Sequence, residues 1–222
     1  MTGDTVSQDL HPVRRRVLRR YAALPPAVRW HVAARLSLCS VEPVLPRLPR
    51  EGLLVDLGCG HGQFCHWIAC RLPKLSVLGL DPCARRIRAA RRTQRPKVRF
   101  EEGGPARLTG LRPQVILAMD ILYLCPKERW PELFLSCRRA VGPSGLLLLK
   151  ETVSRAPWLF PLIKLQESVM TRVFGISSGI PYQHLPPARV RELLGAAGWR
   201  ARTSDLPGPG PYTQRWHVAE PA

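Results

Sequence analysis

The 222-residue sequence has no long apolar run and no paired cysteine motif. Its polar start, MTGDTVSQDLHP, lacks the apolar core of a secretory signal, and no later stretch approaches the roughly 20 apolar residues that a membrane-spanning helix needs. The seven cysteines include no CxxC pair, and their odd number argues against a disulfide framework. We therefore expect reduced thiols in a cytoplasmic protein that is at most peripheral at a membrane.

Acidic residues are scarce relative to basic ones. The 16 Asp and Glu residues stand against 34 Lys and Arg residues, which gives a net charge of +18 and a pI near 10.9. Most of this charge is arginine, since the lysines are Lys74, Lys97, Lys127, Lys150 and Lys164. A basic surface favours phosphates, anionic lipid or acidic partners, but an arginine-rich chain with many Ala and Pro residues also arises from coding bias alone. The charge by itself does not select a partner.

The chain has the length and composition of one globular domain with additions: 45% of its residues are hydrophobic and 23% are charged. From residue 52 onward, short apolar runs alternate with helical stretches. The runs LLVDL, VLGL, VILAM and LLLL are apolar on successive residues, which is typical of parallel strands covered on both faces. We predict an α/β fold with a doubly wound, mostly parallel seven-stranded sheet that ends in a C-terminal antiparallel hairpin.

The segments around this sheet differ in character. We expect residues 1–12 to be flexible and residues 13–48 to form an N-terminal helical cap, with 49–222 as the α/β domain. Residues 151–183 are rich in aromatic and aliphatic side chains, so we expect a helical insertion after the fifth strand that acts as a lid.

A glycine loop directly follows the first predicted strand. In DLGCGHGQF, Asp56 ends the strand and Gly58, Gly60 and Gly62 alternate with other residues, so backbone amides can approach a ligand at a helix start. The spacing is G-x-G-x-G, whereas a dinucleotide fingerprint is G-x-G-x-x-G. A tight strand-to-helix turn without a ligand is the alternative. VDLGCGHG at 55–62 resembles motif I of the class I S-adenosylmethionine-dependent methyltransferases, a Rossmann-like family.

The resemblance implies S-adenosyl-L-methionine as cofactor and S-adenosyl-L-homocysteine as product. Asp56 and the loop backbone would hold the amino-acid end, and Asp81, about twenty residues beyond the loop, would accept hydrogen bonds from the ribose hydroxyls. After the third strand the family often has an acid near the adenine amine, but this chain has Gly104 there. The implied cofactor-binding residues are Asp56, Gly58, Cys59, Gly60, Gly62, Asp81, Pro82, Gly103, Gly104 and Asp120.

Methyl transfer chiefly requires alignment of acceptor, methyl carbon and sulfur, although a protonated acceptor also needs a base. Our candidate catalytic residues are Asp120 and Tyr123, which follow the fourth predicted strand, and His184 near the end of the insertion. Asp120 is equally suited to orienting a loop, and His184 to a surface position. The His and Cys residues near the glycine loop match no common zinc spacing, so we assign no metal.

The apolar insertion favours a small, apolar or lipid-like acceptor. Two arginine-rich stretches, 14–20 and 85–92, suggest the alternative of a nucleic acid or protein substrate, which we consider less favoured. The stretch 13–38 interleaves arginines with apolar residues, so it is also suited to peripheral contact with an anionic membrane. A cofactor-binding protein without activity is a minor alternative, and the oligomeric state does not follow from the sequence.

Overall fold

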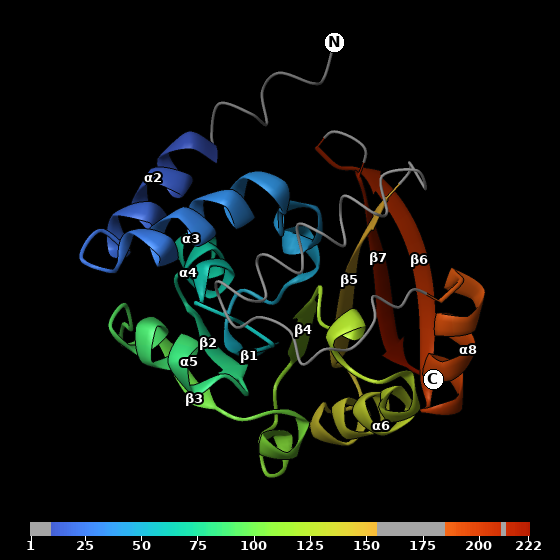
Figure 1. Ribbon diagram of the computed structural model, residues 1–222. Helices are drawn as coiled ribbons and strands as arrows, with labels where there is room; N and C mark the ends of the chain where they lie inside the picture. The colour runs from blue at the N-terminus through green and yellow to red at the C-terminus, as the bar shows by residue number, and fades with distance from the viewer. Residues whose placement is uncertain (1–9, 155–184, 210–211) are drawn as a thin grey trace.

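The computed structural model describes residues 10–154, 185–209 and 212–222. Seven strands form one sheet in the order β3-β2-β1-β4-β5-β7-β6 (Figure 1). Their bounds are β1 Gly52–Leu57, β2 Leu75–Asp81, β3 Val98–Glu102, β4 Val115–Met119, β5 Leu146–Ser154, β6 Trp199–Pro207 and β7 Tyr212–Pro221. Strands β1 to β5 pair in parallel, whereas β7 pairs antiparallel with both β5 and β6. The predicted α/β sheet with its C-terminal hairpin is confirmed.

The strand order reverses at the centre of the sheet. The chain builds outward from β1 through β2 to β3, then returns to place β4 on the other side of β1. Leu54 of β1 accordingly lies beside Val77 of β2 and Val115 of β4. In open α/β sheets, ligands bind outside the carboxyl ends of the strands at such a reversal. The loop that leaves β1 starts at this point.

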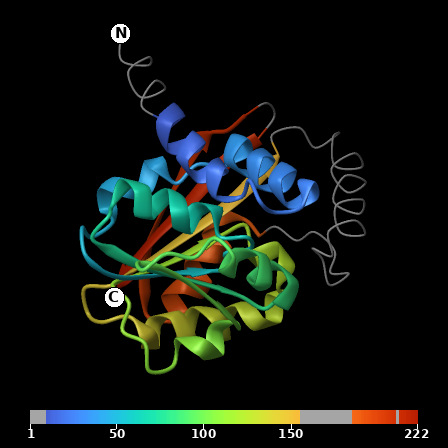
Figure 2. The ribbon, with the colours of Figure 1, turned by 90° about the vertical axis from the view of Figure 1, so that its left-hand side faces the viewer.

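Helices cover both faces of the sheet, as the continuous apolar strands require. One face carries α2 Leu10–Arg20, α3 Pro26–Leu38 and α4 Gln63–Arg71, and the other carries α6 Trp130–Ala140 and α8 Pro187–Ala196. Figure 2 shows the blue helices α2 and α3 beyond the teal helix α4 on one side, with α6 on the opposite side. Successive residues of β1 point into the two layers, since Leu54 belongs to the first core and Val55 to the second.

The N-terminal helices are packed into the core. Val17 of α2 and Val32 of α3 are both fully buried, and Tyr21, just after α2, is 1% exposed. Helix α3 begins at Pro26, where a missing amide hydrogen has no consequence because the first turn leaves amides unpaired. We expected residues 1–12 to be flexible, but helix α2 begins at Leu10, so residues 10–12 are helical. Residues 1–9 lie outside the described residues.

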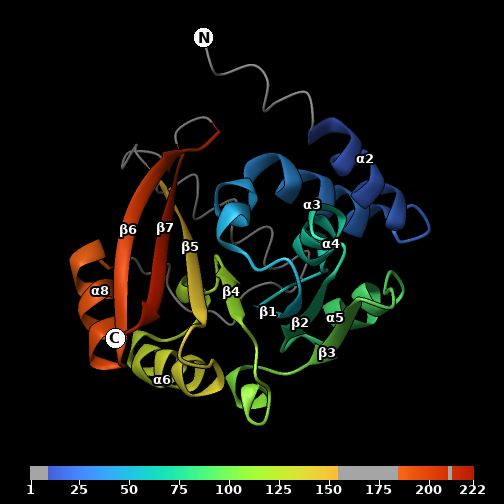
Figure 3. The same cartoon turned by 180° about the vertical axis from the view of Figure 1, so that it is seen from behind.

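Strand β5 is longer than the sequence pattern indicated. It continues to Ser154 because its pairing with β7 extends through Thr152↔Gln214 to Ser154↔Tyr212. The first four residues of the segment 151–183 therefore lie in a strand and not in a helix, and the rest of that segment lies outside the described residues. Figure 3 shows β6 at the edge of the sheet beyond β7, with α8 beside it. In the described ranges, no helix is long and apolar enough to cross a membrane.

Candidate active site

The glycine loop between β1 and α4 has a backbone conformation that favours glycine. Gly58, Gly60 and Gly62 have φ values of 79°, 59° and 80°. A Cβ added at Gly62 would lie 2.3 Å from the Phe100 ring, whereas a Cβ added at Gly60 would meet no atom within 4 Å. Gly62 therefore lacks a side chain because Phe100 packs against it. At Gly60 the lack of a side chain leaves the loop backbone open to a ligand.

Asp81 joins the loop to the end of β2. Its Oδ2 accepts a hydrogen bond from the Gly60 amide at 3.0 Å, and its Oδ1 accepts one from the Cys83 amide at 2.8 Å. Arg86 Nη1 lies 3.5 Å from the same Oδ2. The Asp81 carboxylate is thus fixed directly beside the open position at Gly60. Oxygens held in this way still have lone pairs to accept hydrogen bonds from ribose hydroxyls.

Asp56 lies beneath the loop and is 2% exposed. The Cys65 thiol of α4 donates a hydrogen bond to Asp56 Oδ2 at 3.1 Å. Burial raises the pKa of Asp56 to about 6; the Cys65 hydrogen bond opposes this rise and the nearby Asp81 adds to it. A buried carboxylate is unfavourable unless it is paired with a positive charge, so this position is suited to bind a cationic group of a ligand.

The positions expected around the adenine lie on the far side of Asp81. The Gly103 amide donates to the Asp81 backbone oxygen at 3.1 Å, which holds the turn after β3 against the end of β2. A Cβ at Gly104 would meet nothing within 4 Å, and Pro82 is exposed. Cys59, by contrast, turns inward: its sulfur would lie 2.7 Å from a Cβ at Gly79. Its backbone, and not its side chain, is therefore the part available to a ligand.

Asp120 follows β4 with a φ of 58°, in the left-handed region that Asp tolerates better than most residues. Its Oδ2 lies 2.9 Å from Lys150 Nζ and 3.0 Å from Arg35 Nη2. Its Oδ1 accepts hydrogen bonds from the Thr152 amide at 2.8 Å and the Thr152 hydroxyl at 2.9 Å. The Cys39 thiol lies 3.6 Å from Oδ2. Both carboxylate oxygens are thus fully engaged.

This network keeps Asp120 ionised. Burial would raise its pKa, but Lys150 and Arg35, together with the hydrogen bonds, lower the pKa well below the ordinary range. A carboxylate of such low basicity is a poor proton acceptor. The contacts of Asp120 link the end of β4 to α3 and β5 and favour a structural role, of which orienting a loop was the form considered from the sequence; its part in catalysis stays a prediction.

The structure places the other two catalytic candidates differently. Tyr123 lies in the short helix Leu122–Leu124. Burial lowers the pKa of the Arg35 guanidinium, but Cys39, Asp120 and Tyr123 together outweigh burial, so the pKa is raised overall. His184 lies outside the described residues. Tyr123 is therefore near the same cluster as Asp120, and the role of His184 stays a prediction.

The N-terminal helices contribute groups to the site that the sequence did not single out. The Tyr21 hydroxyl donates to the His61 backbone oxygen at 2.8 Å, and the rings of His31 and His61 lie 5.0 Å apart. Arg35 reaches Asp120 across 85 residues of chain and lies over the Phe64 ring. A local motif search does not reveal these contacts, because each joins the cap to a strand end or loop far away in sequence.

Two buried polar atoms at the loop have no hydrogen-bond partner within the described part of the chain. They are His61 Nδ1 and Gln63 Oε1, from residues that are 7% and 3% exposed. Unpaired buried polar atoms are rare in proteins, and a bound ligand or water is an ordinary explanation. With the open Gly60 and the fixed Asp81, they show that the residues present fit the expected cofactor. Among the described residues, no group of three or more His, Cys, Asp or Glu is arranged to hold a metal ion.

In sequence, the chain is similar to known methyltransferases. Residues 30–203 match the sequence family described as "Methyltransferase domain". A trans-aconitate 2-methyltransferase of Deinococcus radiodurans is 32% identical over 114 residues, which cover 50% of this chain and 41% of that protein. This chain thus spans less than half of that relative's length.

Solved structures share the fold at low sequence identity. Magnesium protoporphyrin IX methyltransferase from Synechocystis PCC 6803, solved with bound S-adenosylhomocysteine, has a TM-score of 0.62 at 19% identity, with 98% of this chain and 95% of that chain covered. The cyclopropane synthase MmaA2 from Mycobacterium tuberculosis has a TM-score of 0.61 at 13% identity, with 81% and 82% covered. At these identities the likeness concerns the fold alone.

Proposed function

Because the chain belongs to the class I S-adenosylmethionine-dependent methyltransferases, we propose that it methylates a small, lipid-like acceptor that carries a carboxylate. The bound cofactor supplies an electrophilic methyl group on a sulfonium. The protein's part is to bind and orient the two reactants and to exclude water from them. The observation that carries the proposal is the juxtaposition of the open Gly60 backbone, the fixed Asp81 and the engaged Asp120 at one sheet edge.

Each cofactor residue has a distinct proposed task. Asp81 accepts hydrogen bonds from the ribose hydroxyls, and the backbone from Gly58 to Gly62 follows the methionine portion. Asp56, whose buried carboxyl has a raised pKa, balances the charge of the cofactor ammonium. Gly104 and Pro82 leave room at the adenine. We propose these roles from the positions of the residues and from the family.

A carboxylate acceptor is supported by the state of Asp120. A hydroxyl or amine acceptor must lose a proton, and Asp120 is unsuited to accept it because its oxygens are occupied by Lys150, Arg35 and Thr152. A carboxylate is already a nucleophile at neutral pH, so alignment suffices for its methylation. The relative in Deinococcus radiodurans is named for trans-aconitate, which is an acid. The lipid-like body is proposed from the apolar sequence APWLFPLIKL at 156–165.

The test is methyl transfer from radiolabelled S-adenosylmethionine to matched acceptors: a medium-chain fatty acid, trans-aconitate, the corresponding fatty alcohol, and an oligonucleotide. We expect label in the fatty acid, as a methyl ester that base hydrolyses to labelled methanol. Asp81→Ala should abolish transfer, and Asp205→Ala, which changes an exposed carboxylate in β6, should not. Label in the alcohol or oligonucleotide with none in either acid would contradict the proposal.

A further inference from the structure

The helices α2 and α3 carry a concentration of positive charge without any acid. Residues 10–38 contain seven arginines, no lysine and no aspartate or glutamate. Three of the seven are held by packing: Arg14 bonds to Ser37, Arg35 bonds to Asp120, and Arg20 is half-buried. The remaining four, Arg15, Arg16, Arg19 and Arg29, are exposed. The site already accounts for Arg35, but nothing in it uses these four.

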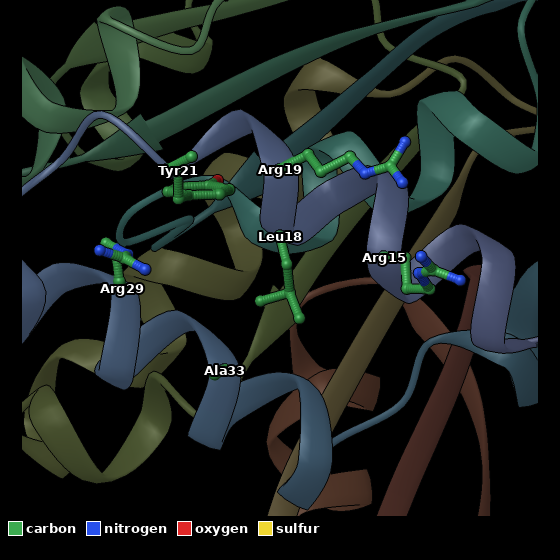
Figure 4. Close-up of a pocket in the computed structure, with 7 residues that line it drawn as sticks. Arg15, Leu18, Arg19, Tyr21, Arg29 and Ala33 are labelled. Atoms are coloured by element: carbon green, nitrogen blue, oxygen red, sulfur yellow. The ribbon is translucent and has the colours of Figure 1, made fainter.

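Three of the exposed arginines border one hollow of about 400 Å³ between α2 and α3. Arg15, Leu18 and Arg19 lie on one face of α2, because residues three and four apart are neighbours on a helix. Figure 4 shows Leu18 pointing from α2 toward α3, with Arg15 to one side of it and Arg29 to the other. Tyr21 and Ala33 complete the apolar part of the lining. The hollow therefore combines an apolar floor with a cationic rim.

Helix α3 also exposes a large apolar side chain near each of its ends. Trp30, next in sequence to Arg29, is 60% exposed, and Leu38 is 42% exposed. Large apolar side chains in water are unfavourable, whereas tryptophan and arginine together are stable at the boundary between lipid headgroups and acyl chains. A soluble phosphate would use the arginines alone and leave Leu18 and Trp30 without a role.

We propose that the α2–α3 face, defined by Arg15, Arg19, Arg29, Leu18 and Trp30, docks on the surface of an anionic phospholipid bilayer. The arginines pair with lipid phosphates at the rim of the hollow. Leu18 and Trp30 contact the upper part of the acyl region. The absence of any acid in residues 10–38 means that no like charge on this face opposes the membrane. This docking does not depend on which acceptor is methylated.

The experiment is flotation of the full chain with vesicles, without cofactor or acceptor. Vesicles of phosphatidylcholine alone are compared with vesicles that contain phosphatidylglycerol, at low salt and at 1 M salt, where charges are screened beyond about 3 Å. The variant Arg15→Gln/Arg19→Gln/Arg29→Gln removes the rim. The matched control Arg88→Gln/Arg99→Gln/Arg139→Gln removes the same charge from exposed positions on other elements. Circular dichroism checks that both variants fold.

We expect binding to the phosphatidylglycerol vesicles alone, weakened by salt. Each basic residue near an anionic surface strengthens binding about fivefold, so loss of the rim should weaken it on the order of a hundredfold. The control variant should lose much less, and Trp30→Ser should weaken binding at both salt concentrations because its contribution is apolar. Equal losses in the two triple variants would overturn the proposal, as would binding to neutral vesicles or none to anionic ones. Preferential binding of an oligonucleotide through the same three arginines would also overturn it.

Discussion

Replacing Asp120 by Asn tests whether the buried charge cluster holds the N-terminal helices onto the sheet. Asn tolerates the left-handed backbone at this position and keeps an acceptor for Thr152, so the change chiefly removes the charge. The Lys150 side chain is completely buried and would lose its anion 2.9 Å away. Removing one partner of a buried ion pair destabilises a protein by about 3–5 kcal/mol. We expect a loss of this size for Asp120→Asn, measured by urea unfolding.

The double variant Asp120→Asn/Lys150→Met distinguishes the charge from the shape. With both charges of the pair removed, the part of the penalty that comes from the fully buried Lys150 should disappear, while Arg35, whose side chain is 25% exposed, keeps its smaller share. The coupling free energy in the double-mutant cycle should be several kcal/mol. Asp205→Asn is the matched control, because Asp205 pairs with Arg215 through two bonds of 2.7 Å but is 45% exposed. Exposed pairs contribute about 0.2–1 kcal/mol. Equal effects of Asp120→Asn and Asp205→Asn would refute the reasoning.

Two further predictions concern the glycine loop. Asp56 has a folded pKa of about 6, above its unfolded value of about 3.9, so the folded state binds the extra proton between these values and the contribution of Asp56 to stability falls as pH rises through this window. Asp56→Asn should remove this slope from unfolding free energies measured between pH 4 and 7; an unchanged slope would contradict the raised pKa. Gly60→Ala should cost about 1 kcal/mol of stability and weaken S-adenosylmethionine binding in calorimetry at least tenfold, because its Cβ enters open space. Gly62→Ala should instead chiefly destabilise the fold by meeting Phe100, and equal thermal stability of the two variants would count against this difference.

The sheet could be predicted from sequence because local patterns determine it. Buried parallel strands are apolar on successive residues, as VILAM is in β4, and the glycines and prolines between the strands mark where each ends. The G-x-G-x-G spacing predicted a strand-to-helix loop at this place, and in the structure all three glycines have positive φ. The length of β5 was underestimated because Thr152 to Ser154 pair with β7, about sixty residues later.

The contacts that complete the site could not be predicted in the same way. Arg35 lies in an unremarkable helical stretch, and its role depends on the ion pair with Asp120, which exists only once α3 packs over the sheet. Asp120 itself was correctly placed at the end of a strand, but whether it acts as a base or an anchor depends on Lys150, Arg35 and Thr152 together. Sequence patterns give the positions of such side chains, and packing decides their charge.

The claim that the glycine loop and Asp81 hold S-adenosylmethionine is tested most directly by isothermal titration calorimetry. The full chain should bind S-adenosylmethionine and S-adenosylhomocysteine at the same single site. Hydrogen bonds to a charged group contribute about 1.5–3 kcal/mol, so Asp81→Ala should weaken both by about a hundredfold or more while Asp205→Ala binds like the wild type. Absence of heat with either ligand, or unchanged affinity in Asp81→Ala, would contradict the account.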